Sequence, residues 1–235
     1  MRLTRAQHAT ALQALADDEI RPYLTTHSDL PGPRGNLELI AAAADVLARQ
    51  LALELADEAD EYLRCCGVVT LGRLVLDDPA DAGPLALLTA RAADPLWRVR
   101  EAVAMAAQRI GDADPVRLCT LVEAWVRDGD PLVVRAGVAA VCEPRLLRDP
   151  ATAQAAVAAC ERATAHLLAV PADRRRDGSV RVLRQGLGYC WSVAVAAEPA
   201  RGLPAFDALP LDDPDVAWVV RENRTKKRLV QLLGT

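Results

Sequence analysis

A five-residue pattern occurs twice in this chain and constrains its fold more than any other feature. Residues 97–101 read Trp-Arg-Val-Arg-Glu and residues 218–222 read Trp-Val-Val-Arg-Glu, each time after an acidic stretch that contains proline. Each copy stands at the start of an apolar helical pattern, and weaker copies lie between the two. A pattern repeated in this way predicts that the chain is a stack of similar helical units.

An arginine marks the corresponding position in five segments, at successive intervals of 36, 35, 49 and 37 residues. Three of these intervals match a two-helix repeat of roughly 35 to 45 residues. The third interval is longer because it contains residues 171–178, a polar segment that we expect to form a loop. The marker arginines are Arg64, Arg100, Arg135, Arg184 and Arg221.

An acidic residue precedes each marker arginine by a few positions. Its carboxylate is suited to cap the second helix of a unit, or to accept hydrogen bonds from amides in the turn before that helix. The arginine is long enough to reach the acidic turn of a neighbouring unit, so we expect a ladder of Asp–Arg pairs between adjacent units. The acidic residues are Asp60, Asp94, Asp130, Asp177 and Asp215.

Residues 94–107 resemble the inner turn and second helix of a HEAT repeat, and residues 130–139 are similar. The resemblance covers most of residues 36–235. It implies an all-α fold, a right-handed α-α superhelix (a HEAT-like solenoid) of about five helix pairs, with residues 36–235 forming one continuous array. In this interpretation the structural markers of the repeat are Trp97, Trp218, Asp94 and Asp130.

The first 35 residues are expected to cap this array. Apolar spacing predicts one amphipathic helix from Thr4 to Tyr23, with Thr4 as its N-cap. Residues 25–35 are rich in proline and glycine and therefore predict a loop. A second helix is expected to begin near Asn36, whose side chain suits an N-cap.

Composition agrees with closely packed helices. Hydrophobic residues make up 51% of the chain, but aromatic residues only 3%, so the core must consist mainly of Ala, Leu and Val side chains. No apolar run is long enough to span a membrane, and the first residues lack the apolar segment of a secretion signal. We therefore expect a cytoplasmic protein without a membrane partner.

The six cysteines form no Cys-x-x-Cys pair, and no histidine lies near them in sequence. Because an unpaired cysteine behaves as a small hydrophobic residue, we interpret them as buried thiols rather than metal ligands. The three histidines are scattered, and the glycine pattern of a dinucleotide-binding loop is incomplete. We expect no metal and no cofactor.

A narrower resemblance is to the HEAT-like DNA alkylation repair proteins, which include alkylpurine DNA glycosylases of the AlkD type. It lies in the chain length, the marker arginines and the basic C-terminal helices. It implies a basic concave surface that cradles duplex DNA, and a catalytic aspartate one helical turn after a tryptophan. Asp128 follows Trp125 at this spacing, but residues 128–131, Asp-Gly-Asp-Pro, predict a turn rather than a helix interior.

Two basic clusters, at residues 174–184 and 221–228, are the leading candidates for a binding surface. On neighbouring units they would form one surface able to neutralise several phosphates. The alternative is a solvated face with helix C-termini whose dipoles these cations complement. The candidate binding residues are Arg100, Arg135, Arg181, Arg184, Arg221, Arg224, Lys226 and Lys227.

The tryptophan and glutamate of the repeated pattern lie four residues apart and therefore share a helix face. Such a pair could hold a cationic group in a groove. Alternatively, the tryptophan packs on its partner helix and the glutamate joins the ladder between units. Because a catalytic group normally occurs once and this pair occurs twice, we favour the second interpretation.

We interpret the chain as a non-catalytic interaction or scaffold module that binds a protein or peptide on a concave face formed by the second helices. The alternative is a protein that binds duplex DNA, with or without alkylpurine glycosylase activity. A small-molecule pocket between units is a third hypothesis. No catalytic residue is identified at this stage, and the sequence does not specify the partner or the oligomeric state.

Overall fold

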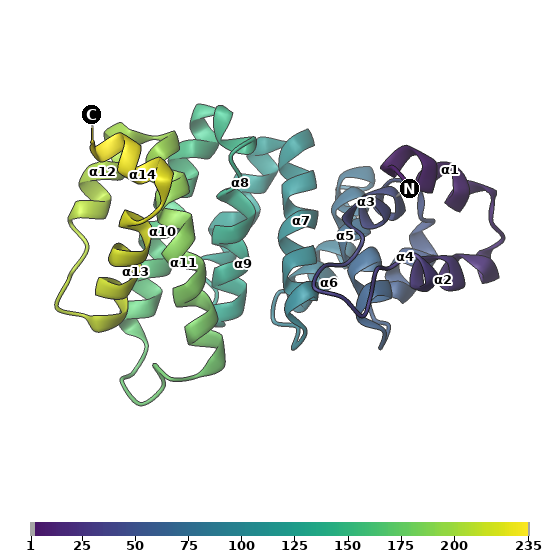
Figure 1. The fold of residues 1–235 in the computed structure, drawn as a ribbon, viewed down its shortest axis with the longest axis horizontal. Helices are drawn as coiled ribbons and strands as arrows, with labels where there is room; N and C mark the ends of the chain where they lie inside the picture. Colours follow the sequence, from purple (N-terminus) through teal and green to yellow (C-terminus); the bar gives the residue numbers. More distant parts are fainter. Residues whose placement is uncertain (1–2, 235) are drawn as a thin grey trace. The chain divides into compact units, whose positions relative to one another are not determined.

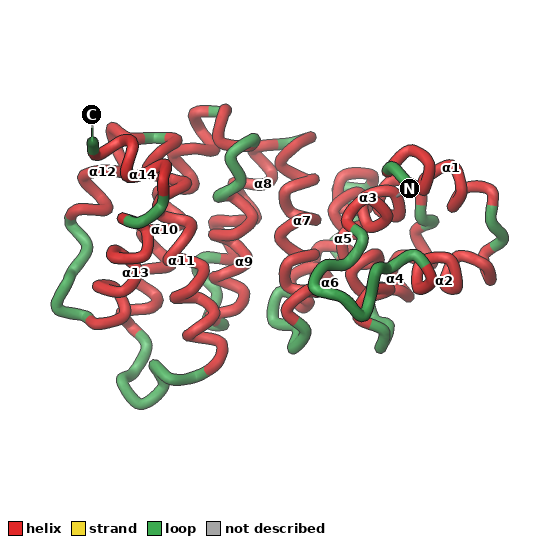
Figure 2. The backbone as a smooth tube through the Cα atoms, viewed as in Figure 1, coloured by secondary structure: helices red, strands yellow, loops and turns green. Residues whose placement is uncertain are grey.

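The computed structural model describes residues 3–234, which form fourteen α-helices and one short 3-10 helix and contain no β-strand (Figures 1 and 2). The predicted all-α fold class is confirmed. Among these residues no helix is both long and apolar enough to cross a membrane.

The chain divides into two compact units, with the boundary between Ile110 and Gly111 near the end of helix α7. The helices that begin in the first unit are α1 Arg5–Ala14, α2 Asp17–Thr26, α3 Leu37–Val46, α4 Arg49–Leu55, α5 Glu61–Asp77, α6 Gly83–Arg91 and α7 Trp97–Ala113. The second unit contains α8 Pro115–Trp125, α9 Pro131–Val141, the 3-10 helix Leu146–Arg148, α10 Pro150–Ala169, α11 Gly178–Ala197, α12 Pro199–Asp207, α13 Pro214–Arg224 and α14 Lys227–Leu233.

Helix α5 is the central element of the first unit and contacts α2, α3, α4 and α6. Two glycines let it approach its neighbours closely. A Cβ atom added at Gly67 would lie 2.6 Å from the carbonyl carbon of Leu55 in α4, and one at Gly72 would lie 2.9 Å from the carbonyl carbon of Ala106 in α7. No side chain fits at these distances, so the two glycines set the spacing of α5 from α4 and α7.

One carboxylate connects the first and last helices of this unit. Asp45, near the end of α3, accepts hydrogen bonds from Nε of Arg5 in α1 and from Nη2 of Arg109 in α7, both at 2.6 Å. Burial alone would raise the pKa of Asp45. The hydrogen bonds from the two guanidinium groups outweigh burial and hold this pKa below its usual range.

The second unit has two layers of helices. In one layer α11 lies between α9 and α13, and in the other α10 contacts both α8 and α12. The layers meet where α10 packs on α9 and α11. Trp191 of α11 fills this region, because its ring lies 5.6 Å from that of Phe206 and its Nε1 donates a hydrogen bond to Oγ1 of Thr164 at 3.0 Å.

A buried asparagine joins α13 to α11. The side chain of Asn223 accepts a hydrogen bond from the backbone amide of Ser192 and donates hydrogen bonds to the carbonyl oxygens of Leu187 and Val219, all at 2.8 Å. Asn223 is fully buried. Its amide therefore satisfies backbone groups that would otherwise be buried without a partner.

The prediction of one helix from Thr4 to Tyr23 is wrong, because the chain breaks at Leu15 and Ala16. Both residues have an extended backbone. Three acidic residues follow in the first turn of α2, where they favour a new helix N-terminus, and the side chain of Glu19 accepts a hydrogen bond from the amide of Ala16 at 2.9 Å. Residues 1–35 were expected to contain one capping helix and a Pro/Gly-rich loop, and their described part, residues 3–35, instead contains two helices before the loop.

Most of the predicted N-caps are confirmed. Thr4, Asn36, Asp60 and Asp130 each accept a hydrogen bond from an amide in the first turn of the helix that follows. Asp177 holds the N-cap position of α11 but makes no such bond. The prediction for Asp215 is wrong, because Asp213 caps α13 instead and accepts the amides of Asp215 and Val216.

Ion pairs of the predicted ladder are present in both units. Arg64 donates to Asp94 at 3.0 Å, and Arg184 donates to Asp215 at 2.6 Å. Asp94 lies in the turn before α7, and Asp215 lies in the first turn of α13, so each arginine reaches the start of the second helix of the following helix pair. The marker arginines stand in different turns of their helices, since Arg64 and Arg100 are the fourth residues of α5 and α7, whereas Arg184 is the seventh residue of α11 and Arg221 the eighth residue of α13.

Replacement of Asp94 by asparagine is expected to lower the free energy of unfolding by about 3 kcal/mol, because it leaves the guanidinium of Arg64 without its buried carboxylate. Asp94 is 3% exposed and also accepts the amide of Leu96. Urea unfolding followed by circular dichroism measures the change. Asp77→Asn is the control, because it removes an exposed pair with Arg73 and should change stability by less than about 1 kcal/mol.

Candidate functional site

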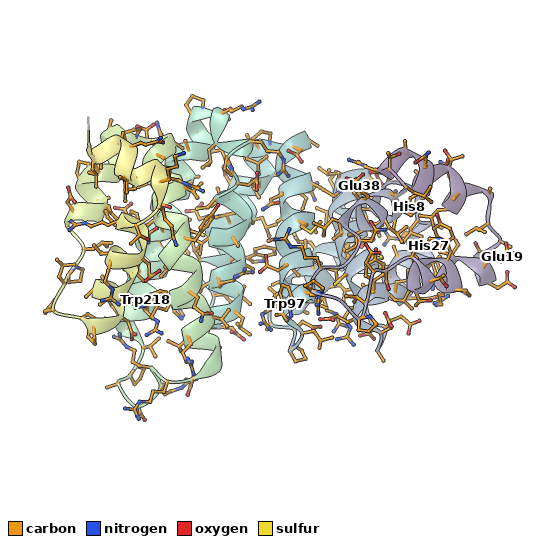
Figure 3. The ribbon with its side chains drawn as sticks, in the orientation of Figure 1. His8, Glu19, His27, Glu38, Trp97 and Trp218 are labelled. Atoms are coloured by element: carbon orange, nitrogen blue, oxygen red, sulfur yellow. The ribbon has the colours of Figure 1, made fainter. Side chains whose placement is uncertain are left out.

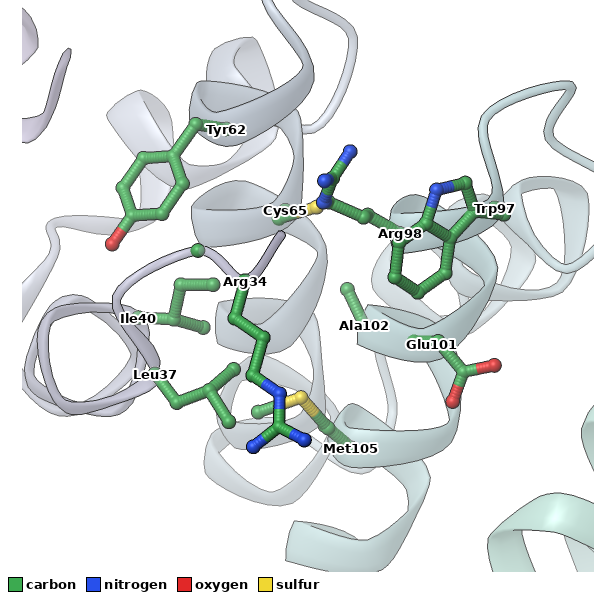
Figure 4. Close-up of a pocket in the computed structure, with 11 residues that line it drawn as sticks. Arg34, Leu37, Ile40, Tyr62, Cys65, Trp97, Arg98, Glu101, Ala102 and Met105 are labelled. Carbon is green, nitrogen blue, oxygen red and sulfur yellow. The ribbon is translucent and has the colours of Figure 1, made fainter. Parts of the chain in front are cut away.

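The first unit contains an apolar pocket of about 250 Å³ lined by α3, α5, α7 and the loop before α3. In Figure 4, Trp97, Ala102 and Met105 of α7 face Leu37 and Ile40 of α3 across the cavity, and Cys65 of α5 lies behind them. We call this cavity the Trp97 pocket. The remaining lining residues are Arg34, Gly35, Tyr62, Arg98 and Glu101.

Two large apolar side chains at this pocket lie in solvent. Trp97 is 52% exposed and Leu37 is 57% exposed. The guanidinium carbon of Arg98 lies 4.7 Å from the centre of the Trp97 ring. Arg98 itself is held by Glu61 at 2.9 Å and by the carbonyl oxygen of Gly32 at 3.0 Å. The indole therefore has a fixed neighbour on one side and an open face toward the pocket.

Charged groups of opposite sign lie at the pocket. Arg34, in the loop before α3, is exposed, and within residues 3–234 it makes no ion pair or side-chain hydrogen bond. Glu101 lies on the α7 side (Figure 4). An entering group therefore meets an unpaired cation on one wall and a carboxylate on the other.

The deeper polar groups of the pocket are structural. The hydroxyl of Tyr62 donates a hydrogen bond to the carbonyl oxygen of Asn36 at 2.7 Å, which fixes the start of α3. Burial raises the pKa of the Tyr62 hydroxyl, and burial followed by the charge of Glu61 raises the pKa of the Cys65 thiol to about 12. Cys65 is therefore a thiol at neutral pH and not an activated nucleophile.

The second tryptophan of the repeated pattern has a different environment. Trp218 packs across α11 at Gly188, where an added Cβ atom would lie 2.8 Å from its ring, and the guanidinium carbon of Arg184 lies 4.8 Å from its ring centre. The packed arrangement that we favoured for both tryptophans describes Trp218 but not Trp97. Both are labelled in Figure 3.

The first basic cluster is largely used inside the second unit. Arg175 donates to Asp213 at 2.9 Å and to Asp215 at 3.2 Å, and Arg184 shares Asp215. Arg174 pairs with Asp177 at 3.1 Å. Arg181 is exposed and has no ion-pair partner within the described chain.

The second cluster is more open. Arg224 lies 3.6 Å from Asp207, and Arg228 donates to the hydroxyl of Tyr189 at 2.8 Å. Arg221, Lys226 and Lys227 make no ion pair within residues 3–234. Of the other candidate binding residues, Arg100 donates to the carbonyl oxygens of Asp94 and Pro95 at the start of its own helix, and Arg135 passes beside Gly186 of α11.

The arrangement implied for a glycosylase does not form at Trp125 and Asp128. Trp125 is 2% exposed in the core of the second unit, so its ring cannot face a flipped base. Asp128 lies after the end of α8, as the Asp-Gly-Asp-Pro pattern predicted, and its carboxylate accepts the amide of Asp130 within the turn.

None of the six cysteines, all of which the structure describes, forms a disulfide, and all except Cys119 are buried. In the described part of the chain no group of three or more His, Cys, Asp or Glu residues could hold a metal ion. Comparison of the chain with models of known protein families, and with curated proteins, finds no match.

The repeated pattern singles out Trp97 but not the rest of its pocket. Arg34 and Gly35 fall in the loop predicted for residues 25–35, and Leu37 and Ile40 fall in the helix predicted to begin near Asn36. Leu37 could have indicated a binding surface, because it is a large apolar residue at the first position of a helix, where side chains are seldom deeply packed. Its contribution to a pocket with Trp97 depends on how α3 packs along α5, which the sequence pattern does not specify.

Proposed function

We propose that this chain is a non-catalytic, HEAT-like interaction module that binds a segment of a partner protein at the Trp97 pocket. The proposal includes a right-handed stacking of the helix pairs, in which α3, α5 and α7 belong to the partner-binding layer. The observation that carries it is the apolar cavity of about 250 Å³ with a half-exposed tryptophan and a half-exposed leucine at its edge.

The size of the cavity favours a single anchoring side chain. Sites for cofactors and drug-sized ligands measure about 300 to 1,000 Å³, so the Trp97 pocket is small for them. Protein interfaces concentrate their binding energy in a few apolar or aromatic side chains that enter such pockets. An apolar anchor from a partner would cover Trp97 and Leu37, which otherwise stay in water.

The charges at the pocket give the bound segment a direction. Arg34 has no acidic partner within residues 3–234, and a carboxylate of the partner would form a charge-assisted hydrogen bond with it. Glu101, on the other wall, would repel that carboxylate. We therefore expect the partner segment to carry an acidic residue on the Arg34 side of its anchor.

Duplex DNA is the second candidate partner, favoured by the exposed cations Arg181, Arg221 and Lys227 and by the partly exposed Lys226. Neighbouring aspartates oppose DNA binding, because they already neutralise Arg175, Arg184 and Arg224 and would repel the phosphates. A DNA-binding surface would give a gel shift at about 50 mM salt that weakens steeply as salt rises and is lost when these four cations are reversed. Absence of a shift at that salt concentration removes this candidate.

Replacement of Trp97 by alanine is expected to weaken peptide binding at least about 30-fold, which corresponds to the cost of about 2 kcal/mol for a central anchor contact. The probe is a random peptide library displayed on phage. Peptides enriched on the wild-type protein are then synthesised, and their dissociation constants are measured by fluorescence polarisation.

Leu211→Ala is the matched control, because Leu211 is a large apolar residue of the second unit with a similar exposure of 58%. Its peptide affinities should stay within about twofold of wild type. If the enriched peptides bind wild type, Trp97→Ala and Leu211→Ala equally well, the Trp97 pocket is not the binding site and the proposed function is wrong.

A further inference from the structure

A buried histidine lies next to the loop that forms one wall of the Trp97 pocket. His8 of α1 is 1% exposed, and its Nδ1 lies 2.9 Å from the hydroxyl of Tyr23 in α2. Its ring centre lies 6.0 Å from that of His27, which stacks on Tyr23 at 4.2 Å. Figure 3 shows His8 and His27 near each other in this part of the first unit.

Hydrogen bonds fix the orientation of Asn36 beside this histidine. Its Oδ1 accepts the amide of Leu39 at 3.2 Å, which caps α3, so its amide nitrogen is directed elsewhere. That nitrogen donates to the carbonyl oxygen of His27 at 3.0 Å and lies 3.3 Å from Nε2 of His8. Because the NH₂ group of Asn36 is a donor and faces Nε2 of His8, Nε2 must be the acceptor. Neutral His8 must therefore carry its proton on Nδ1.

A second proton on His8 has no acceptor in this arrangement. It would sit on Nε2 and face the NH₂ group of Asn36. If the Asn36 amide turned over to accept this proton, Leu39 would lose its cap and the carbonyl oxygen of His27 would lose its donor. Protonation therefore requires either Asn36 or His8 to leave its position.

Asn36 also holds the pocket wall. Its backbone carbonyl oxygen accepts a hydrogen bond from the hydroxyl of Tyr62 at 2.7 Å, and its backbone N–H donates to the carbonyl oxygen of Ser28 at 2.9 Å. Its neighbours in sequence, Gly35 and Leu37, both line the Trp97 pocket. Displacement of Asn36 therefore moves the wall formed by the loop and the first turn of α3.

Charged and titratable groups act on His8 from every segment that packs against it. Burial is the largest influence and lowers its pKa, and the charge of His27 lowers it further. Glu38 on α3 and Asp29 in the loop act in the opposite direction without reversing the shift. Tyr23 of α2 contributes a hydroxyl whose own pKa is raised by burial, so it stays uncharged.

We propose that His8 is an acid-sensitive control of the Trp97 pocket, in which protonation of its imidazole displaces Asn36, uncaps α3 and loosens the wall that binds the partner. The effect on partner binding rests on the proposed function, whereas the displacement of Asn36 does not. In the loosened state His8 regains its ordinary pKa of about 6.5. The arrangement with Asn36 in place is therefore at its most stable, relative to the loosened state, above about pH 6.5. Its stability relative to that state decreases as the pH falls below this value.

The displacement is tested by NMR on the intact chain, without a partner. The backbone amides of Leu39 and Ile40 should shift with the same midpoint as the His8 ring between about pH 7.5 and about pH 5. His8→Gln can accept the Asn36 amide but cannot be protonated, so the shared transition should disappear. His27→Gln is the control and should retain it.

A second variant keeps the test valid if His8→Gln does not fold. Asn36→Asp still accepts the Leu39 amide but offers an acceptor to protonated Nε2, so the midpoint of His8 should move to higher pH. If the Leu39 amide stays unchanged through the His8 titration in wild type, or if Asn36→Asp leaves the midpoint where it was, the proposal is wrong.

Partner binding is measured with the peptides enriched on the wild-type protein. Their affinity for wild type and His27→Gln should fall about tenfold between about pH 7.5 and about pH 5, and their affinity for His8→Gln should not change. If no peptide depends on Trp97 for binding but the NMR transition of His8 and Leu39 is present, the proposed function is wrong and the acid-sensitive role of His8 stands. Equal peptide affinity at both pH values overturns the control alone.

Discussion

Replacement of Gly67 by alanine is expected to lower the free energy of unfolding by about 3 kcal/mol, although alanine is the better helix former. The added methyl group would lie 2.6 Å from the carbonyl carbon of Leu55 and 2.7 Å from the carbonyl oxygen of Ala52. These are backbone atoms of α4, so no change of side-chain rotamer relieves the contact. Helices α4 and α5 must move apart, and the buried side chains around them lose contacts.

Gly129→Ala is the matched control. No atom lies within 4 Å of the position that its Cβ would take, and its backbone has no positive φ angle. The unfolded chain loses freedom while the folded chain meets no obstacle, so stability should stay the same or rise by about 0.4 to 1 kcal/mol. Urea unfolding followed by circular dichroism compares the two variants. Equal stability of Gly67→Ala and Gly129→Ala would contradict the close approach of α4 and α5.

Replacement of Asn223 by aspartate is expected to lower the free energy of unfolding by about 4 kcal/mol at neutral pH, because it buries a charge without a partner. The new carboxylate can accept the Ser192 amide, but its second oxygen faces the carbonyl oxygens of Leu187 and Val219. Asn223→Leu leaves the same backbone groups unsatisfied without adding charge, and about 2 kcal/mol is expected.

The pH dependence of the stability of Asn223→Asp distinguishes the cost of the buried charge from the cost of the changed side-chain shape. Burial raises the pKa of the new carboxyl group above its unfolded value of about 3.9. The stability of the variant relative to wild type is therefore highest below about pH 4, where the protonated group can donate a hydrogen bond, and falls as the pH rises through the folded-state pKa. A deficit that is independent of pH would show that the charge is not buried.

Structural features that depend on local chemistry could be predicted from the sequence. Thr4, Asn36, Asp60 and Asp130 cap their helices because a short polar side chain before an apolar helical pattern has few other roles. The Arg64–Asp94 and Arg184–Asp215 pairs were predictable because the repeat brings each arginine to the turn of the next unit. The break at Leu15 was missed, since the apolar spacing continues through it and only the acidic run after it signals a second helix.

The site depends on packing that the sequence pattern does not contain. The two tryptophans of the repeated pattern have nearly identical local sequences, yet Trp218 packs against Gly188 and Trp97 stands half-exposed beside a cavity. Trp218 has room against α11 because the residue four positions after Arg184 is a glycine, Gly188. The residue four positions after Arg64 in α5 is Val68. Asn223 was missed for a related reason, since a polar residue in a basic stretch is normally on the surface.

The connection between Asp45 and Arg109 has a consequence for how the chain is made. The carboxylate in α3 reaches its second arginine only after 64 further residues have been synthesised, and Gly72 reaches Ala106 at nearly the same point. At about 5 to 20 residues per second, a ribosome needs about 5 to 20 s to translate residues 1–110. Before Ala106 and Arg109 have been synthesised, α3 and α5 cannot make these contacts with α7, so the packing of the first unit is completed only at the end of this interval.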